Sequence, residues 1–119
     1  MPVPRIKRVY DAPADDDGLR VLVDRLWPRG LSKDKARVDQ WLKAIAPSPQ
    51  LRGEFHAHPD RWDAFRDAYL AEARANPALP ELRALARRQR VTLLYGFHDP
   101  LHNHAVLLRE LLRELLRGR

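Results

Sequence analysis

The stretch Val91-Thr92-Leu93-Leu94-Tyr95-Gly96-Phe97-His98-Asp99-Pro100 decides the fold class of this 119-residue chain. Residues 91–95 form a short, continuous apolar run, which is typical of a strand that is buried on both faces. After the loop, apolar side chains recur at helical spacing, at Leu101, Ala105, Leu108, Leu112 and Leu115. A strand, a tight loop and a helix in this order predict an α/β layer.

Two earlier segments are also predicted to be strands. Residues 5–10 alternate polar and apolar side chains, and residues 20–26 are rich in valine and leucine. The linker over residues 11–19 is short and acidic. Its Asp15-Asp16-Asp17-Gly18 is expected to be a solvated turn, because the spaced pattern of a calcium loop is missing. The linker is too short for a helical crossover, so the two strands either pair antiparallel or do not adjoin.

The middle of the chain is predicted to be helical. A helical region is expected to follow Ser32, with one apolar face made by Val38, Trp41, Leu42 and Ile45. Ser48 and Pro49 predict the start of a short helix over residues 50–56. A longer helix begins near Pro59, and another covers residues 80–89. The predicted fold is α/β, a small and mainly parallel sheet with helices packed on it, in a single domain over residues 1–119.

The composition limits the classes of function. Cysteine is absent, which excludes thiol nucleophiles, thiolate zinc sites and disulfides, and is compatible with a reducing cytosol. No segment resembles a signal peptide or approaches the ~20 apolar residues that cross a membrane. We therefore expect a cytoplasmic protein that makes no membrane contact.

The charge balance points to an anionic partner. Lysine and arginine total 22 against 16 aspartate and glutamate residues, which gives a net charge of +6 at pH 7. Many of these arginines fall on predicted amphipathic helices, where a solvated face is the ordinary interpretation. Binding of nucleic acid or of a protein through these basic faces is the alternative, although no nucleic-acid motif or interleaved aromatic side chain accompanies them.

Most side chains capable of chemistry lie in two loops, residues 23–30 and residues 95–104. Both loops follow strands, so they are expected at the same edge of the sheet, where open α/β folds bind ligands. The guanidinium groups of Arg25 and Arg29 suit a phosphate or a carboxylate, and Trp27 could stack on a planar ligand. The structural alternative is an ion pair of Arg25 with Asp24 or Asp99, with Trp27 in the core.

The second loop carries three histidines, His98, His102 and His104. Asp99 and Pro100 together predict a helix start, with Asp99 as its cap and His102 in the first turn. A metal ion could take two of the histidines together with Asp24 or Asp99, but their spacing around a helix disfavours convergence of all three. Histidine can equally act as a neutral hydrogen-bonding group or as a general acid or base.

The chain resembles the YeaO-like family of domains of unknown function, of the DUF488 type. The resemblance rests on residues 20–31, RVLVDRLWPRGL, followed by Trp41-Leu42, Pro59-Asp60-Arg61-Trp62 and His102-Asn103-His104-Ala105. It implies a compact bacterial α/β protein and supplies no established reaction. In the wider family the strand before the last loop ends in cysteine and the next helix carries Cys-His-Arg. Tyr95 and Asn103-His104-Ala105 stand at those positions here, so any thiol chemistry of the wider family does not transfer.

The sequence therefore predicts a site for a small anion, phosphate-like or nucleotide-like, between the Arg25–Arg29 and His98–His104 loops. Arg25 and Arg29 would hold the charge, Trp27 would contact the ligand, and Tyr95 and Asn103 would orient it. His104, with His98 beside it, is the candidate for proton transfer. No metal and no particular cofactor is assigned, and whether the protein is an enzyme stays open. The alternatives are the basic-face binding module and a metal site made by histidine and aspartate.

Overall fold

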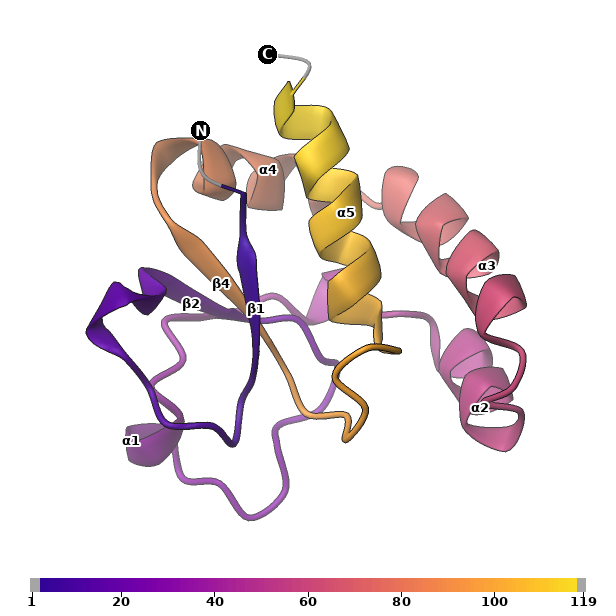
Figure 1. Ribbon diagram of the computed structural model, residues 1–119, viewed down its shortest axis with the longest axis horizontal. Helices are drawn as coiled ribbons and strands as arrows, with labels where there is room; N and C mark the ends of the chain where they lie inside the picture. The colour runs from indigo at the N-terminus through magenta and orange to yellow at the C-terminus, as the bar shows by residue number, and fades with distance from the viewer. Residues whose placement is uncertain (1–2, 118–119) are drawn as a thin grey trace.

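The fold is a parallel sheet with helices on it, which confirms the predicted α/β class (Figure 1). The computed structural model describes residues 3–117. In chain order the elements are β1 (Arg5–Arg8), η1 (Asp15–Asp17), β2 (Leu19–Leu22), α1 (Lys33–Ala36), β3 (Gln40–Trp41), η2 (Lys43–Ile45), α2 (Pro49–Ala57), α3 (Trp62–Arg74), α4 (Leu79–Arg88), β4 (Val91–Tyr95) and α5 (His104–Arg117). The two η elements are single turns of 3₁₀ helix.

The four strands lie in the order β1-β4-β2-β3, and every pairing is parallel. Leu93 of β4 is in register with Ile6 of β1 on one side and with Val21 of β2 on the other. The first two strands of the chain are therefore not neighbours, because β4 lies between them. Of the two alternatives that the sequence left open for these strands, the structure shows that they do not adjoin. The parallel order also brings the carboxyl ends of β1, β4 and β2 together.

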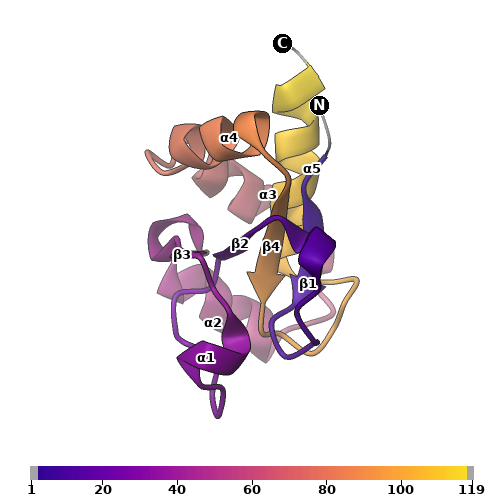
Figure 2. The same cartoon turned by 90° about the vertical axis from the view of Figure 1, so that its left-hand side faces the viewer.

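Alternation along the strands divides the core between the two faces of the sheet. Val21, Val23 and Leu93 face the larger cluster, which α2 to α5 cover with Phe65, Tyr69, Leu108 and Leu112. Leu22, Leu94 and Val9 face a smaller cluster that α1 and the loop before it cover. Figures 1 and 2 show α4 and α1 at opposite ends of the sheet. Within residues 3–117 no helix has the length and apolar character that spanning a bilayer requires.

The helical region predicted after Ser32 is confirmed only over residues 33–36 and is wrong beyond them. Ser32 caps α1, but α1 ends after one turn because Arg37 adopts a left-handed conformation with φ 49°. Beyond it, Gln40 and Trp41 pair with β2 as strand β3. The apolar spacing that indicates a helix instead serves an extended segment and η2. Tertiary pairing with β2 has overridden the local pattern.

The acidic linker is also more than a solvated turn, because Asp17 is buried at 2% exposure. Its carboxylate accepts hydrogen bonds from Lys7 Nζ at 2.8 Å, from the Ala14 amide at 3.0 Å and from the Arg20 guanidinium. Gly18 then adopts φ 69°, and a Cβ there would lie 2.4 Å from the carbonyl oxygen of Arg90. The linker is thus tied to β1, β2 and β4 at their amino ends.

We expect Asp17→Asn to destabilise the fold by about 3–5 kcal/mol, because it leaves two cations without their buried carboxylate. Burial alone would raise the pKa of Asp17, but the hydrogen bonds from Lys7, Ala14 and Arg20 outweigh it and lower the pKa. The carboxylate therefore stabilises the fold at neutral pH. That contribution is lost as the pH falls below about 3.9, through the folded-state pKa. Urea unfolding at neutral and acidic pH measures both effects.

Asp16→Asn is the matched control, since Asp16 pairs with Arg5 at the surface. Equal free energies of unfolding for Asp16→Asn and Asp17→Asn would contradict the role given to the buried carboxylate.

Candidate functional site

The two loops singled out by the sequence lie side by side at the carboxyl ends of β2 and β4. The Gly96 amide donates a hydrogen bond to Asp24 Oδ2 at 2.9 Å, and His104 Nε2 lies 2.9 Å from the carbonyl oxygen of Val23. A Cβ at Gly96 would lie 3.1 Å from Asp24 Oδ2, so glycine permits this close approach. The convergence follows from the parallel pairing of β2 with β4.

His104 is the first residue of α5, and its side chain is 13% exposed. Its Nε2 faces two acceptors, the Val23 carbonyl and Asp24 Oδ1, the latter at 3.2 Å. Nε2 must therefore carry the proton. Only the contact with Val23 has hydrogen-bond geometry, and Asp24 Oδ1 is buried without a donor among residues 3–117.

Aromatic side chains pack around the contact between His104 and the end of β2. The ring of Tyr69 meets the imidazole of His104 edge-on, with centroids 5.8 Å apart. The Tyr69 hydroxyl donates to the carbonyl oxygen of Ile45 at 2.8 Å, and burial raises its pKa far above the usual range, so it stays protonated. The indole of Trp41 donates to the carbonyl oxygen of Asp24 at 2.7 Å. These bonds fix the backbone at the end of β2.

The cap of α5 is Asn103 rather than Asp99. Asn103 is 1% exposed, and its Oδ1 accepts from the Val106 amide at 3.0 Å. Asp99 Oδ1 accepts from the amides of Leu101 and His102, at 2.9 and 3.2 Å, and so caps a turn that precedes the helix. The helix begins later than Pro100 predicts, and His102 lies outside it.

The side chains of Tyr95 and Trp27 both pack against other residues of the chain. Tyr95 is 3% exposed in the larger cluster, and burial raises the pKa of its hydroxyl, which lies beside Asn103. Trp27 packs edge-on against Trp41 with centroids 5.4 Å apart, and its indole donates to the carbonyl oxygen of Leu31 at 2.7 Å. Trp27 thus anchors its loop on the smaller cluster.

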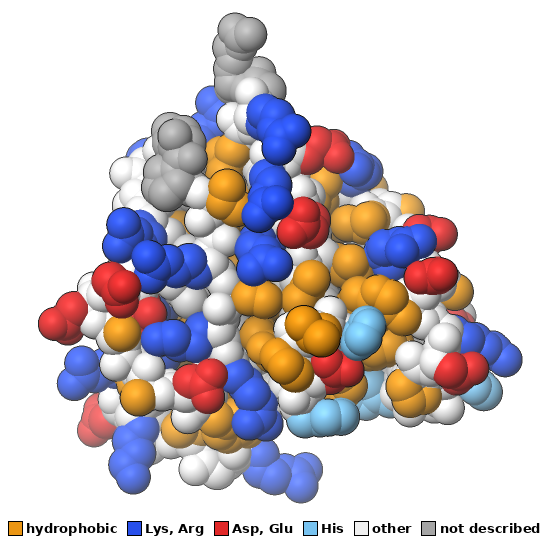
Figure 3. Space-filling model, viewed as in Figure 1, with side chains coloured by type: hydrophobic (Ala, Val, Ile, Leu, Met, Phe, Trp, Pro, Cys, Tyr) orange, Lys and Arg blue, Asp and Glu red, His pale blue; other side chains and the backbone are white. Residues whose placement is uncertain are grey.

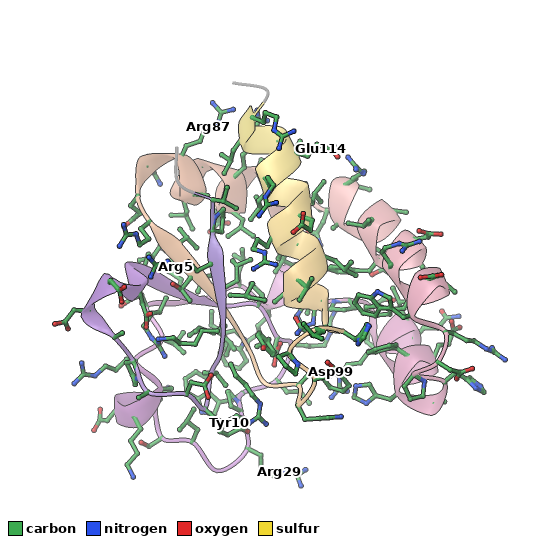
Figure 4. All side chains as sticks on the ribbon, in the orientation of Figure 1. Arg5, Tyr10, Arg29, Arg87, Asp99 and Glu114 are labelled. Atoms are coloured by element: carbon green, nitrogen blue, oxygen red, sulfur yellow. The ribbon has the colours of Figure 1, made fainter. Side chains whose placement is uncertain are left out.

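The two arginines of the first loop differ in their surroundings. Arg25 Nη2 donates to the carbonyl oxygen of Pro47 at 3.1 Å, whereas Nε is buried and has no acceptor among residues 3–117. The ion pair of Arg25 with Asp24 or Asp99, which was the structural alternative to ligand binding, is not among the ion pairs of the described chain. Arg29 is exposed and extends into solvent, while its carbonyl accepts from the Tyr10 hydroxyl at 2.9 Å (Figure 4).

Arg8 belongs to the same edge and was missed by reasoning from the sequence. Its guanidinium donates from Nε to the carbonyl oxygen of Phe97 at 3.1 Å and from Nη2 to that of Gly96 at 3.3 Å. The side chain therefore ties the end of β1 to the loop that follows β4. The available signal was its position as the last polar residue of an alternating strand.

The remaining histidines lie at the surface. Phe97 packs between His98 and His56, with ring centroids 4.5 and 5.5 Å away, and partial burial, Arg52 and His98 lower the pKa of His56. Figure 3 shows histidine side chains near α2 and the loop before α5, with hydrophobic side chains among them. No cluster of three or more metal-ligating side chains occurs within residues 3–117.

Comparison with known proteins places the chain in a family. The model of the family described as "Inactive DUF488-N3 subclade" matches residues 4–119. The chain is 44% identical over 110 residues to the Escherichia coli protein named "Uncharacterized protein YeaO", an alignment that covers 92% of this chain and 96% of the relative. It is also 44% identical over 108 residues to "Uncharacterized protein Rv3073c" of Mycobacterium tuberculosis, covering 91% and 92%. No solved structure matches the chain.

We expect His104→Ala to lower the free energy of unfolding by about 1–3 kcal/mol, because it leaves the buried carbonyl oxygen of Val23 without its donor. His102→Ala is the matched control, since His102 is exposed and its ring contacts Asp99 at the surface. Urea unfolding of both variants compares them directly. If His102→Ala cost as much as His104→Ala, the contact between His104 and β2 would not be the stabilising one.

Proposed function

The chain belongs to the inactive DUF488-N3 subclade, and on that premise we propose that it binds a small anion at the carboxyl ends of β2 and β4 without converting it. The word "inactive" in the family description supports binding without turnover. The complete absence of cysteine also supports it, because no thiol is present to act as a nucleophile.

The buried Nε of Arg25 is the observation that carries the proposal. Arg25 Nη2 is fixed on the carbonyl oxygen of Pro47, while Nε is removed from solvent and has no acceptor among residues 3–117. Leaving a buried donor unpaired costs about 1–3 kcal/mol, and more when the group is charged. An anion can accept from Nε only if the atoms that cover it shift, and such an anion would remove this cost.

The surrounding groups favour an anion over a cation. Asp24 Oδ2 already accepts from the Gly96 amide while Oδ1 lies 3.2 Å from His104 Nε2, and Asp99 Oδ1 accepts from two amides of its own turn. Arg29 and His98 at the rim are exposed and can add positive charge or hydrogen-bond donors. Phosphate, carboxylate and the phosphate of a nucleotide share the geometry that an arginine fork recognises.

The other residues assigned to the ligand have structural partners. His104, Asn103, Tyr95 and Trp27 hold the two loops in place, so in this proposal they shape the site without touching the anion. The proton-transfer roles of His104 and His98 stay predictions.

The basic helix faces support a nucleic-acid partner less well. Arg74 of α3 pairs with Glu114 of α5 at 3.0 Å, and Arg109 and Arg113 both approach Glu110. Carboxylates thus interrupt the positive charge along α5. If duplex or single-stranded nucleic acid bound with a steep dependence on salt, that alternative would gain support over the small-anion site.

Titration with inorganic phosphate, sulfate and a nucleoside monophosphate, followed by backbone amide shifts, tests the proposal. We expect at least one probe to shift the amides of residues 23–30 and 96–99. Arg25→Gln should weaken binding about tenfold or more, because a hydrogen bond to a charged group contributes about 1.5–3 kcal/mol.

Two further variants make the result interpretable. Arg29→Gln removes an exposed charge of the same loop and should weaken binding without affecting stability, whereas Arg88→Gln removes a charge from α4 and should leave binding unchanged. The proposal fails if no probe binds, or if Arg25→Gln and Arg29→Gln both bind like the unsubstituted chain.

A further inference from the structure

A groove of about 290 Å³ lies between α4 and the last turns of α5, lined by Leu79, Pro80, Arg83, Ala84, Arg87 and Leu115. α4 precedes β4 in the chain and lies beyond its amino end, whereas the anion site lies at the carboxyl end. Figures 1 and 2 show α4 at one end of the molecule and the loop before α5 toward the other. The groove is thus separate from the loops discussed above.

Two arginines of the groove have buried donors with no acceptor. Arg83 Nε and Arg87 Nη2 are both removed from solvent and unpaired among residues 3–117. Some other helix arginines in the described chain have carboxylate partners, such as Arg74 with Glu114. No ion pair of the described residues includes Arg83 or Arg87. Figure 4 shows Arg87 beside the end of α5. Because both side chains line the groove, it carries positive charge that the described chain does not neutralise.

The rest of the lining is apolar. Arg83 and Arg87 are four residues apart on α4, so they lie on one side of the helix. Ala84 between them is small, while Leu79, Pro80 and Leu115 supply hydrocarbon surface. A ligand that satisfies both halves of this surface must combine an anionic head with an aliphatic chain.

We infer that this groove binds a medium-length aliphatic carboxylate, with the carboxylate on Arg83 and Arg87 and the chain along Leu79, Pro80 and Leu115. A guanidinium fork accepts the two oxygens of a carboxylate side by side. Each liquid water occupies about 30 Å³, so the groove has room for a ligand of about ten heavy atoms. Octanoate has this size, and it is therefore the probe of choice.

Octanoate binding to the full chain is measured by titration calorimetry and by amide shifts. We expect a Kd of about 1 mM or tighter for the groove, seen as shifts of the amides of α4 and the end of α5. Acetate keeps the charge without the chain, and octylammonium keeps the chain with the opposite charge, so neither should shift the amides of α4 and the end of α5 at that concentration. Octylammonium binding as strong as that of octanoate would show that charge does not select the ligand.

Three variants separate the two halves of the groove. Arg83→Gln and Arg87→Gln should each weaken octanoate binding about tenfold or more, whereas Arg88→Gln, an exposed arginine of the same helix, should leave it unchanged. Ala84→Leu should block the groove without changing any charge. Thermal unfolding confirms that each variant is folded.

Several outcomes would overturn the inference. It fails if octanoate does not bind, or if it binds equally well after Arg83→Gln, Arg87→Gln and Ala84→Leu. It also fails if the groove is covered by a second copy of the chain, which would appear as a concentration-dependent dimer that Ala84→Leu dissociates and octanoate does not disturb. The anion site at the other end is unaffected by each of these results, because Arg25 does not line the groove.

Discussion

β4 is hydrogen-bonded along both of its edges, and the rest of the molecule is arranged by that constraint. Its neighbours β1 and β2 are the first two strands of the chain, yet within the sheet β4 lies between them. A strand in this position has no free backbone edge and must bury both faces, which explains why all five of its residues are buried. Because all pairings are parallel, three loops emerge together at the carboxyl end of the sheet.

Two aspartates, Asp17 and Asp24, tie the chain together at the two ends of the sheet. Asp17 precedes β2, and its carboxylate accepts hydrogen bonds from the side chains of Lys7 and Arg20. Asp24 follows β2, and its carboxylate accepts a hydrogen bond from the Gly96 amide and lies beside His104. Each carboxylate joins segments that are distant in the sequence. The side chains of Asp24 and His104, at the carboxyl end of the sheet, therefore serve to hold the fold together. Arg25 in the loop that follows β2 and Arg83 and Arg87 on α4 keep guanidinium nitrogens without an acceptor among residues 3–117.

The sequence predicted the elements whose patterns are local and continuous. The apolar run of residues 91–95 is β4, and the Ser48-Pro49 signal starts α2 as expected. Prediction failed where a distant contact decides the conformation. Trp41 has helical spacing to its neighbours but is extended, because its backbone pairs with β2 and its indole reaches Asp24. Asp17 is buried by cations from two strands, which no pattern within residues 11–19 could reveal.

In the candidate site, too, some features could be predicted from local patterns and others depend on distant contacts. The meeting of the two loops could be predicted, since both follow parallel strands. The sequence could not predict which side chains of the two loops stay accessible, because their exposure depends on atoms from elsewhere in the chain. Trp27 is held by Leu31 and Trp41, Arg25 is oriented by Pro47, and Arg8 enters the edge from β1.

The two outer strands of the sheet have a bearing on how the protein behaves in a crowded solution. An open sheet edge is a template on which strands of other molecules can assemble. Here one border, β3, is only two residues long. The other, β1, carries Arg5, Lys7 and Arg8 within its four residues, so that a like strand approaching it would meet its own positive charge. Both borders therefore discourage intermolecular strand addition and the aggregation that follows from it.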